Sequence, residues 1–249
     1  MTDARRLSDR ACLTVGGEGA TEFLQNLVTC NVERLSPGEA TFGALLTPQG
    51  KILFDFLIVR RDDGFLIDVA AERRADLMRR LLFYRLRAPV TIEESDAIVT
   101  VRSDGTGVAD PRDGALGHRQ WGAQDAAPAA DGTADWHARR IERGIPECDR
   151  DYAPETTFPH EALMDRFALA FDKGCYVGQE VVSRMQHRGT ARSRFVAVEG
   201  DAFPAMGTPL TRDGRRVGVM GASARQRGLA FCASTRCGPV TRSTAKAWR

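Results

Sequence analysis

A stretch of nine residues, 172–180, concentrates the groups in this chain that are most able to do chemistry. It holds the cation Lys173, the thiol Cys175, two glycines, an aromatic ring, an amide and a carboxylate. The apolar periodicity of residues 181–187 predicts a helix directly behind it, so we expect a loop at a helix N-terminus. The positive end of the helix dipole and Lys173 should both favour the thiolate of Cys175. The glycines permit positive φ angles or a close backbone approach to a ligand.

The simplest alternative for Cys175 is a buried small hydrophobe. Its neighbours Lys173, Tyr176 and Glu180 are polar or charged, which favours a reactive thiol instead. A Cys–His hydrolase is disfavoured, because a helix would carry His187 away from the thiol by about 1.5 Å per residue. We therefore interpret Cys175 as a reactive thiol without a base close in sequence.

Residue spacing disfavours several other common sites. His160 could serve Cys175 as a base only through a tertiary contact, and no residue supplies the third, orienting role. The six cysteines include no Cys-x-x-Cys pair and the four histidines form no metal pair. Neither a disulfide framework, a structural zinc site nor a self-sufficient iron–sulfur cluster is therefore expected. The sequence also has no G-x-G-x-x-G after a strand and no Walker A motif.

A charged residue interrupts an otherwise apolar predicted strand at 52–60. Leu53, Asp55, Leu57 and Val59 alternate onto one face of that strand. An unpaired carboxylate on an apolar face is costly. The face is partly solvated, or Asp55 caps a neighbouring backbone, or Asp55 accepts hydrogen bonds from a polar ligand inside a pocket.

Four arginines follow the motif, at 184, 188, 192 and 194. The commoner interpretation is a solvated helix face and linker. The functional interpretation is a contact with an anion, such as a carboxylate tail, a phosphate or RNA. Aromatic residues are not interleaved with them, which gives little support to stacking on a single strand of nucleic acid.

The elements that must position these groups alternate irregularly between strands and helices. Strands are predicted at 7–15, 41–47, 52–60, 65–70, 90–93 and 98–102, and helices around Phe23, over 72–85 and over 136–143. This order indicates an α+β fold rather than a regular βαβ series. Residues 104–122 are expected to be irregular, and 124–135 to be an exposed linker.

Short alternating runs separated by glycine and proline begin near residue 194 and are typical of a small all-β module. We place a domain boundary there, with a first region at 1–190 and a second at 191–249. Residues 232–249 lack periodicity and large apolar side chains, so we expect a frayed or foreign tail.

The composition limits the class of protein. The chain has 249 residues, 43% of them hydrophobic, which is enough for a sizeable core. A net charge of +2 does not by itself indicate a nucleic-acid binder. No apolar run approaches bilayer length and no signal peptide is visible, so we expect no membrane span and a cytoplasmic location.

The octapeptide 173–180 resembles the Lys-Gly-Cys-Tyr-x-Gly-Gln-Glu signature of the YgfZ family of folate-binding proteins. That family is related to the T-protein, or aminomethyltransferase, of the glycine cleavage system. Stretches at 46–52, 84–87 and 141–146 also look like family landmarks, and the resemblance covers roughly residues 7–229. It implies a T-protein-like folate-binding fold, with a ferredoxin-like α+β core and a small C-terminal β-barrel.

The resemblance also implies that tetrahydrofolate, or a one-carbon derivative, lies in a central channel. It makes Cys175 the functional residue, with Lys173 beside it. A pterin ring favours a carboxylate and aromatic cover, and a glutamate tail favours a cation. The residues expected to contact folate are Asp55, Trp136, Glu142, Tyr176, Gln179, Glu180 and Arg184. A tryptophan at position 136 is otherwise more often part of the core.

Two positions depart from the family pattern. Arg10 stands where some members have a tryptophan, and the glycine pair often found before the signature is replaced by Ala168-Leu169-Ala170.

The function implied first is that of a tetrahydrofolate-binding accessory factor for assembly or repair of iron–sulfur proteins, acting through Cys175. Its partners would be folate, iron–sulfur client or assembly proteins and, indirectly, tRNA through iron–sulfur enzymes that modify it. One cysteine cannot hold a cluster alone, so a cluster would be transient, shared with a partner or bridged across a dimer. The alternatives are a folate-dependent one-carbon transferase and a tRNA-associated binding module that uses Arg184 to Arg194.

Overall fold

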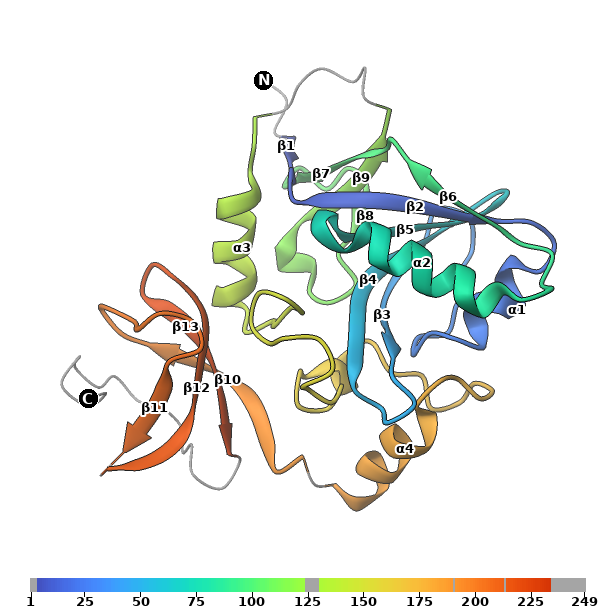
Figure 1. Cartoon of the computed structure of the whole chain (residues 1–249). Coiled ribbons are helices and arrows are strands. Elements are labelled where there is room, and N and C mark those ends of the chain that lie inside the picture. The colour runs from blue at the N-terminus through green and yellow to red at the C-terminus, as the bar shows by residue number, and fades with distance from the viewer. Residues whose placement is uncertain (1–3, 124–129, 190, 213, 234–249) are drawn as a thin grey trace.

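The computed structural model describes residues 4–123, 130–189, 191–212 and 214–233. A five-stranded antiparallel sheet forms the centre of its N-terminal part (Figure 1). In spatial order its strands are β3 (Ala40–Leu46), β4 (Ile52–Arg61), β5 (Gly64–Ala70), β2 (Arg10–Gly16) and β6 (Thr91–Ser95). The predicted hairpin around Pro48 and Gly50 is confirmed, since β3 pairs with β4 on either side of that turn.

Strand β4 is buried on both faces because each face meets a different layer. Phe54, Phe56 and Ile58 pack with α1 (Ala20–Gln25) and α2 (Arg74–Arg85), which cover one side of the sheet. The strand's other face, which carries Asp55, packs against two further apolar clusters. A short 3₁₀ turn, Ala71–Arg73, leads into α2.

A second sheet stands beside the first and was only partly predicted. Its strands, in spatial order, are β1 (Arg5–Arg6), β7 (Ile98–Arg102), β9 (His118–Gly122) and β8 (Val108–Ala109). The prediction that 104–122 is irregular was wrong, because β8 and β9 lie within it. Polar residues dominate β9, and its fully buried Arg119 is held by an ion pair with Asp68, so no apolar alternation marks the strand.

Two helices carry candidate site residues. Helix α3 (Thr133–Glu142) begins three residues before the predicted start at 136, and its preceding linker lies partly outside the described residues. Helix α4 (Gln179–Arg188) follows the motif, as predicted. Single 3₁₀ turns at Gly114–Leu116 and Met164–Arg166 complete the helical elements of the described residues.

The C-terminal part is a third sheet, drawn in orange and red in Figure 1. Its strands, in spatial order, are β10 (Ser193–Glu199), β13 (Arg227–Ala233), β12 (Arg215–Ala224) and β11 (Pro209–Arg212). Phe195 and Leu229 share a buried cluster with Phe42 and Tyr176 of the N-terminal part. The α+β class is thus confirmed, whereas the division into domains at residues 190 and 191 stays a prediction.

The prediction of an unstructured tail from residue 232 onward was wrong for its first two residues. Cys232 is buried within β13, and Ala233 ends that strand. The rest of the expected tail, 234–249, lies outside the described residues. None of the helices in the described ranges has the length and apolar character needed to cross a bilayer.

Candidate functional site

Glycine fixes the motif loop against the tip of the β3–β4 hairpin. Gly178 precedes α4 with a φ of +82°, and a Cβ built on it would lie 2.7 Å from the carbonyl oxygen of Thr47. The same Cβ would lie 3.0 Å from the Cα of Gly50. Of the two motif glycines, Gly178 therefore makes the close backbone approach, and it approaches the hairpin. A Cβ on Gly174 would meet nothing within 4 Å.

Cys175 is the exposed thiol of the described chain. The other cysteines that the structure describes are all buried, namely Cys12, Cys30, Cys148 and Cys232. His160, the tertiary candidate for a base, has its Nε2 at 3.0 Å from Oε1 of Gln186 and makes no hydrogen bond to Cys175. A thiol must be reachable to act as a nucleophile or ligand, so Cys175 alone in the described ranges meets that condition.

Lys173 is bonded to the backbone of another segment. Its Nζ donates to the carbonyl oxygens of Val28 at 2.7 Å and of Cys30 at 2.8 Å. Burial lowers the pKa of the Lys173 ammonium to about 8. Lys173 thus anchors the motif loop to residues 28–30, and its electrostatic effect on the Cys175 thiol stays a prediction.

The remaining motif residues divide between core and surface. Tyr176 is buried, its ring lies 5.1 Å from Nζ of Lys173, and its hydroxyl has no hydrogen-bond partner in the described structure. Gln179 reaches back through Nε2 to the carbonyl oxygen of Gly174 at 3.4 Å. Glu180 is exposed and pairs with Arg184 one turn along α4, at 2.6 Å. Arg184 is therefore part of a surface ion pair.

Asp55 lies inside the molecule, where the 148–152 segment covers β4. Its Oδ2 accepts hydrogen bonds from the backbone N–H of Cys148 at 2.8 Å and from the hydroxyl of Tyr152 at 3.2 Å. No described residue donates to its Oδ1. Burial, followed by the nearby charge of Glu147, raises the pKa of Asp55 to about 6. The carboxyl is thus partly satisfied and has one acceptor oxygen left over.

The two candidates on α3 occupy different environments. Trp136 is 2% exposed, and the guanidinium groups of Arg112 and Arg119 lie 5.1 and 4.7 Å from its ring. Its indole N–H has no partner among the described residues. Glu142 lies near the surface and pairs with Arg225, between β12 and β13, at 2.9 Å. Trp136 is thus a core residue, and Glu142 ties α3 to the C-terminal sheet.

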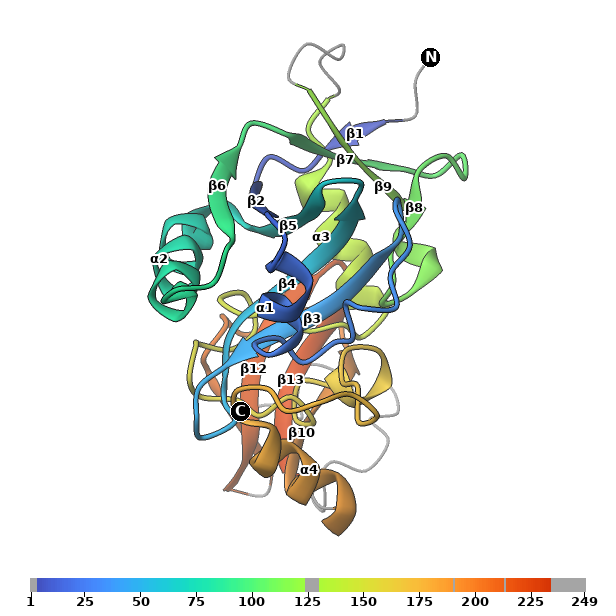
Figure 2. The ribbon, with the colours of Figure 1, turned by 90° about the vertical axis from the view of Figure 1, so that its right-hand side faces the viewer.

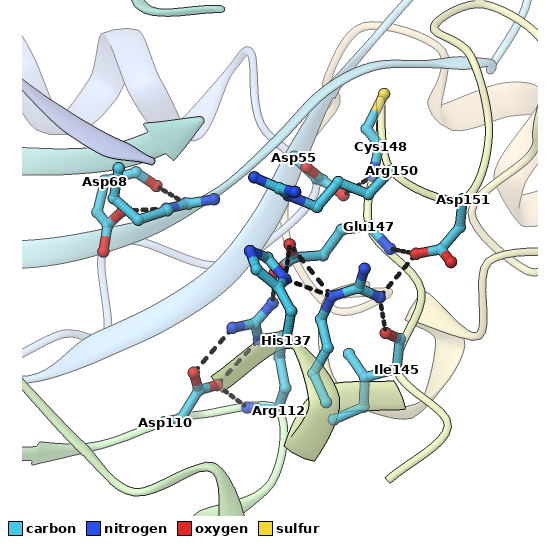
Figure 3. A network of polar contacts seen from close by, with 12 residues as sticks. Asp55, Asp68, Asp110, Arg112, His137, Ile145, Glu147, Cys148, Arg150 and Asp151 are labelled. Atoms are coloured by element: carbon cyan, nitrogen blue, oxygen red, sulfur yellow. Dashed lines mark hydrogen bonds and ion pairs between the residues drawn. The ribbon is translucent and has the colours of Figure 1, made fainter. Parts of the chain in front are cut away.

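A buried network of charges lies beside Asp55, and Figure 3 draws part of it. Its members have side chains that are at most 5% exposed: Arg10, Asp68, Asp110, Arg112, Arg119, Arg140, Glu147 and Asp151. Arg112 contacts Glu147 at 2.6 Å, and Glu147 lies 3.5 Å from Arg140. Four arginines thus face four carboxylates, so the buried charges are compensated.

The segment 147–152 joins this network to both halves of the molecule. Glu147 and Cys148 are adjacent, so the network directly adjoins the residue that donates to Asp55. Asp151 binds Arg140 at 2.7 Å through Oδ2 and accepts from the backbone N–H of Ala222 in β12 at 3.0 Å through Oδ1. Burial alone would raise the pKa of Glu147, but Arg140 and Arg112 outweigh it and hold that pKa well below its usual value.

Sequence reasoning missed most of this network. One usable signal was present: Asp68 interrupts the apolar strand β5 just as Asp55 interrupts β4. Arg10, noted as a departure from the family pattern, donates from Nε to Asp68 at 2.6 Å. That position therefore holds a buried ion pair.

The predicted site residues fall into three groups rather than one. The first group is the loop at the hairpin with the start of α4, and it holds Lys173, Cys175, Tyr176, Gln179, Glu180 and Arg184. Asp55 lies in the interior, and the α3 residues lie apart. No hydrogen bond or ion pair among the described residues joins Cys175 to Asp55. The first two groups are connected through apolar packing. Tyr176 of the motif loop shares a core cluster with Tyr152, whose hydroxyl donates to Asp55.

Comparison with known protein families matches both parts of the chain. A model of the GCVT N-terminal domain matches residues 7–102, and a model of the CAF17 C-terminal beta-barrel domain matches residues 192–242. Among solved structures, the glycine cleavage system aminomethyltransferase T from Bartonella henselae superposes with a TM-score of 0.76 over 93% of this chain and 78% of that one. At 14% sequence identity this likeness shows the fold, and it confirms the predicted T-protein-like architecture.

Curated relatives are closer in sequence. The mitochondrial iron–sulfur cluster assembly factor IBA57 of Homo sapiens is 30% identical over 271 residues, covering 91% of this chain and 76% of the human protein. The IBA57 homolog of Neurospora crassa is 31% identical over 237 residues, covering 79% of this chain. This chain spans about half of that relative, 54% of its length.

These relatives correct the expected location. The sequence led us to expect a cytoplasmic protein, but the curated relatives from human, mouse and Neurospora crassa are all named as mitochondrial proteins. The cytoplasmic expectation is therefore contradicted by the location that the relatives' names give. The expectation failed because it rested on the absence of a recognisable targeting segment, which is weak ground for a location.

Proposed function

Because the chain belongs to the family of iron–sulfur cluster assembly factors IBA57, we propose that it assists assembly or repair of iron–sulfur proteins through Cys175. The observation that carries this proposal is the exposure of Cys175 among otherwise buried described cysteines. The loop that presents it is anchored at both ends, by Lys173 on residues 28–30 and by Gly178 on the hairpin. An anchored loop holds the thiol at a fixed place on the surface.

A cluster handled at Cys175 needs ligands from elsewhere. Protein-bound clusters usually take four cysteine ligands. Within the described residues no three His, Cys, Asp or Glu side chains are grouped to hold a metal ion. The partner is therefore an iron–sulfur assembly or client protein that supplies the remaining ligands, and the cluster is its cargo rather than a resident cofactor.

The folate part of the proposal rests on Asp55. Its Oδ2 is engaged by Cys148 and Tyr152, whereas its Oδ1 accepts no hydrogen bond from a described residue. A pterin carries N–H donors that suit a carboxylate oxygen. We propose that tetrahydrofolate, or a one-carbon derivative, is held chiefly by Asp55.

The role of Cys175 is tested by complementation. Cells that lack the native protein would receive the wild type, Cys175→Ala or the neighbouring control Gly174→Ala, and the activity of iron–sulfur enzymes would be measured. We expect rescue by the wild type and by the control, whose added Cβ meets open space. Full rescue by Cys175→Ala would remove the basis of the proposal.

Folate binding is tested separately by calorimetric titration with tetrahydrofolate. The wild type should bind, and Asp55→Asn should bind about tenfold or more weakly, because one ionic hydrogen bond is lost. The Cys175→Ala protein should bind as the wild type does. Absence of heat with the wild type would exclude the folate role while leaving the role of Cys175 in place.

Three finer interpretations stay predictions from the sequence: membership of the YgfZ group itself, one-carbon transfer, and association with tRNA. The likeness to an aminomethyltransferase is one of fold. Two arginines of the basic run are engaged, Arg184 with Glu180 and Arg194 with Asp165.

A further inference from the structure

Helix α2 ends in an apolar surface that the fold leaves uncovered. Leu82, Phe83 and Leu86 are 38%, 70% and 86% exposed, although most large hydrophobic side chains of the described residues are buried. In Figure 2 the helix lies at the left edge of the molecule. A cluster of exposed large apolar side chains is more typical of an interaction surface than of free solvent contact.

A pocket opens beside these side chains. It has a volume of about 370 Å³ and lies between the start of β4 and α2. Leu53, Phe54 and Phe83 give it apolar walls, and Arg73, Arg79 and Arg80 line its polar side. The guanidinium of Arg73 lies 4.7 Å from the ring centroid of Phe54, so cation and ring already stack. The pocket has room for one large apolar side chain within a cationic rim.

The charge around the pocket is net positive, although Arg73 also pairs with Asp149 at 3.2 Å. Asp76 is its one carboxylate, and it is shared between Arg73 at 3.3 Å and Arg79 at 3.0 Å. In the described structure the side chains of Arg80, Arg85 and Arg87 have no hydrogen bond or ion pair. Uncompensated guanidinium groups next to exposed apolar side chains are complementary to a partner that carries carboxylates beside an apolar residue.

The backbone at the end of α2 is also strained, and the strain is not offset by burial of the side chain within the chain. Leu86 has a φ of +46° and a ψ of −106° at the helix C-cap, a conformation that costs a branched residue free energy. Its side chain offsets none of that cost, because it is 86% exposed. The strained backbone holds Leu86 outward, next to Leu82 and Phe83.

We propose that the α2 surface, defined as the pocket together with residues 79–87, docks an acidic segment of a partner protein. The segment inserts an apolar side chain between Phe54 and Phe83 and sets its carboxylates against Arg79, Arg80 and Arg85. A concave pocket fits an inserted side chain, whereas a lipid surface would be met by protruding side chains alone. This docking goes beyond the role of Cys175 and depends on neither the thiol nor folate.

The test uses the full chain and a labelled peptide of twelve residues, with a central leucine and phenylalanine flanked by glutamates, followed by fluorescence anisotropy. Two matched peptides replace either the glutamates by glutamine or the apolar pair by serine. The first peptide should bind, and each matched peptide should bind about tenfold or more weakly, because charge and anchor both contribute. Binding should weaken as salt is raised.

Protein variants locate the binding. Arg80→Glu and Phe83→Ser, both at exposed or half-buried positions, should each weaken binding of the first peptide by about tenfold. The control Arg188→Glu reverses a charge on α4 and should leave binding unchanged. An equal loss of binding with Arg188→Glu would overturn the proposal, since binding would then follow the net charge of the protein. No loss of binding with the two α2 variants would also overturn it, since the peptide would then bind elsewhere.

Two further measurements separate other occupants. Vesicles of phosphatidylglycerol should not retain the protein in a sedimentation assay; retention that Phe83→Ser abolishes, without peptide binding, would assign the surface to lipid and overturn the proposal. Analytical ultracentrifugation should show the same mass for the wild type and Phe83→Ser. A wild-type dimer that this substitution dissociates would assign the surface to a second copy of the chain and likewise overturn it.

Discussion

The backbones of Gly50 and Gly178 are in close contact, with Gly50 at the tip of the β3–β4 hairpin and Gly178 at the N-terminus of α4. A Cβ on Gly178 would stand 3.0 Å from the Cα of Gly50, and a Cβ on Gly50 would stand 2.8 Å from the Cβ of Val181. Both glycines also have positive φ, +77° and +82°. The position of Cys175 therefore depends on a contact between two backbones that no larger residue permits.

The first prediction concerns that contact. Gly178→Ala should lower the free energy of unfolding by about 1–3 kcal/mol, because it adds backbone strain at positive φ and a clash with the carbonyl oxygen of Thr47. Urea denaturation followed by circular dichroism measures the effect. Gly174→Ala, four residues before the helix cap and in open space, is the matched control and should change stability little. Equal stability of the two variants would contradict the contact.

The second prediction concerns the buried network. Glu147→Gln leaves Arg112 and Arg140 without their shared carboxylate, and breaking a buried pair in this way costs about 3–5 kcal/mol. The same substitution at the surface, Glu142→Gln, breaks an exposed pair with Arg225 and should cost about 1 kcal/mol or less. The free energy of unfolding of both variants would be measured by thermal and urea denaturation. If both variants lost a similar amount of free energy, the buried network would not be the stabilising element.

The third prediction concerns the pH dependence due to Asp55. Its pKa is raised from 3.8 to about 6, so the group contributes stability at low pH that is lost as pH rises through about 6. Asp55→Asn cannot ionise. Relative to the wild type, its free energy of unfolding should therefore be higher at pH 8 than at pH 5, by about 1 kcal/mol. A difference of opposite sign would show that the native carboxylate is stabilised in its charged form.

The fourth prediction concerns Lys173, one of three lysines in the chain. Its side-chain ¹³Cε resonance should titrate with a pKa of about 8, because burial disfavours the ammonium. Lys173→Met should remove that resonance and identify it. The pKa of Lys173 is lower in the folded protein than the value of 10.5 in the unfolded chain. Between about pH 8 and 10.5 the unfolded chain therefore binds more protons than the folded protein. The contribution of Lys173 to stability increases as the pH rises through this range.

Pattern-based prediction was most accurate where apolar periodicity is strong. Strands β4 and β5, helix α2 and the helix after the motif all lie where the sequence places them, because burial of one face leaves a regular signal. It was wrong for β8 and β9, since His118, Arg119 and Gln120 give no such signal. Arg119 is buried by its ion pair with Asp68, fifty-one residues away, and by its place beside Asp110.

The sequence by itself determined the α+β class, the motif at 173–180 and the choice of Cys175, because these depend on local periodicity and residue type. The tertiary structure alone decided where the motif's partners lie. Lys173 is bonded to carbonyl oxygens of residues 28–30 and Asp55 to the backbone of Cys148, contacts that span more than ninety residues. Hydrogen bonds and buried ion pairs between distant segments leave no local pattern in a single chain, so only the folded backbone could show which groups meet.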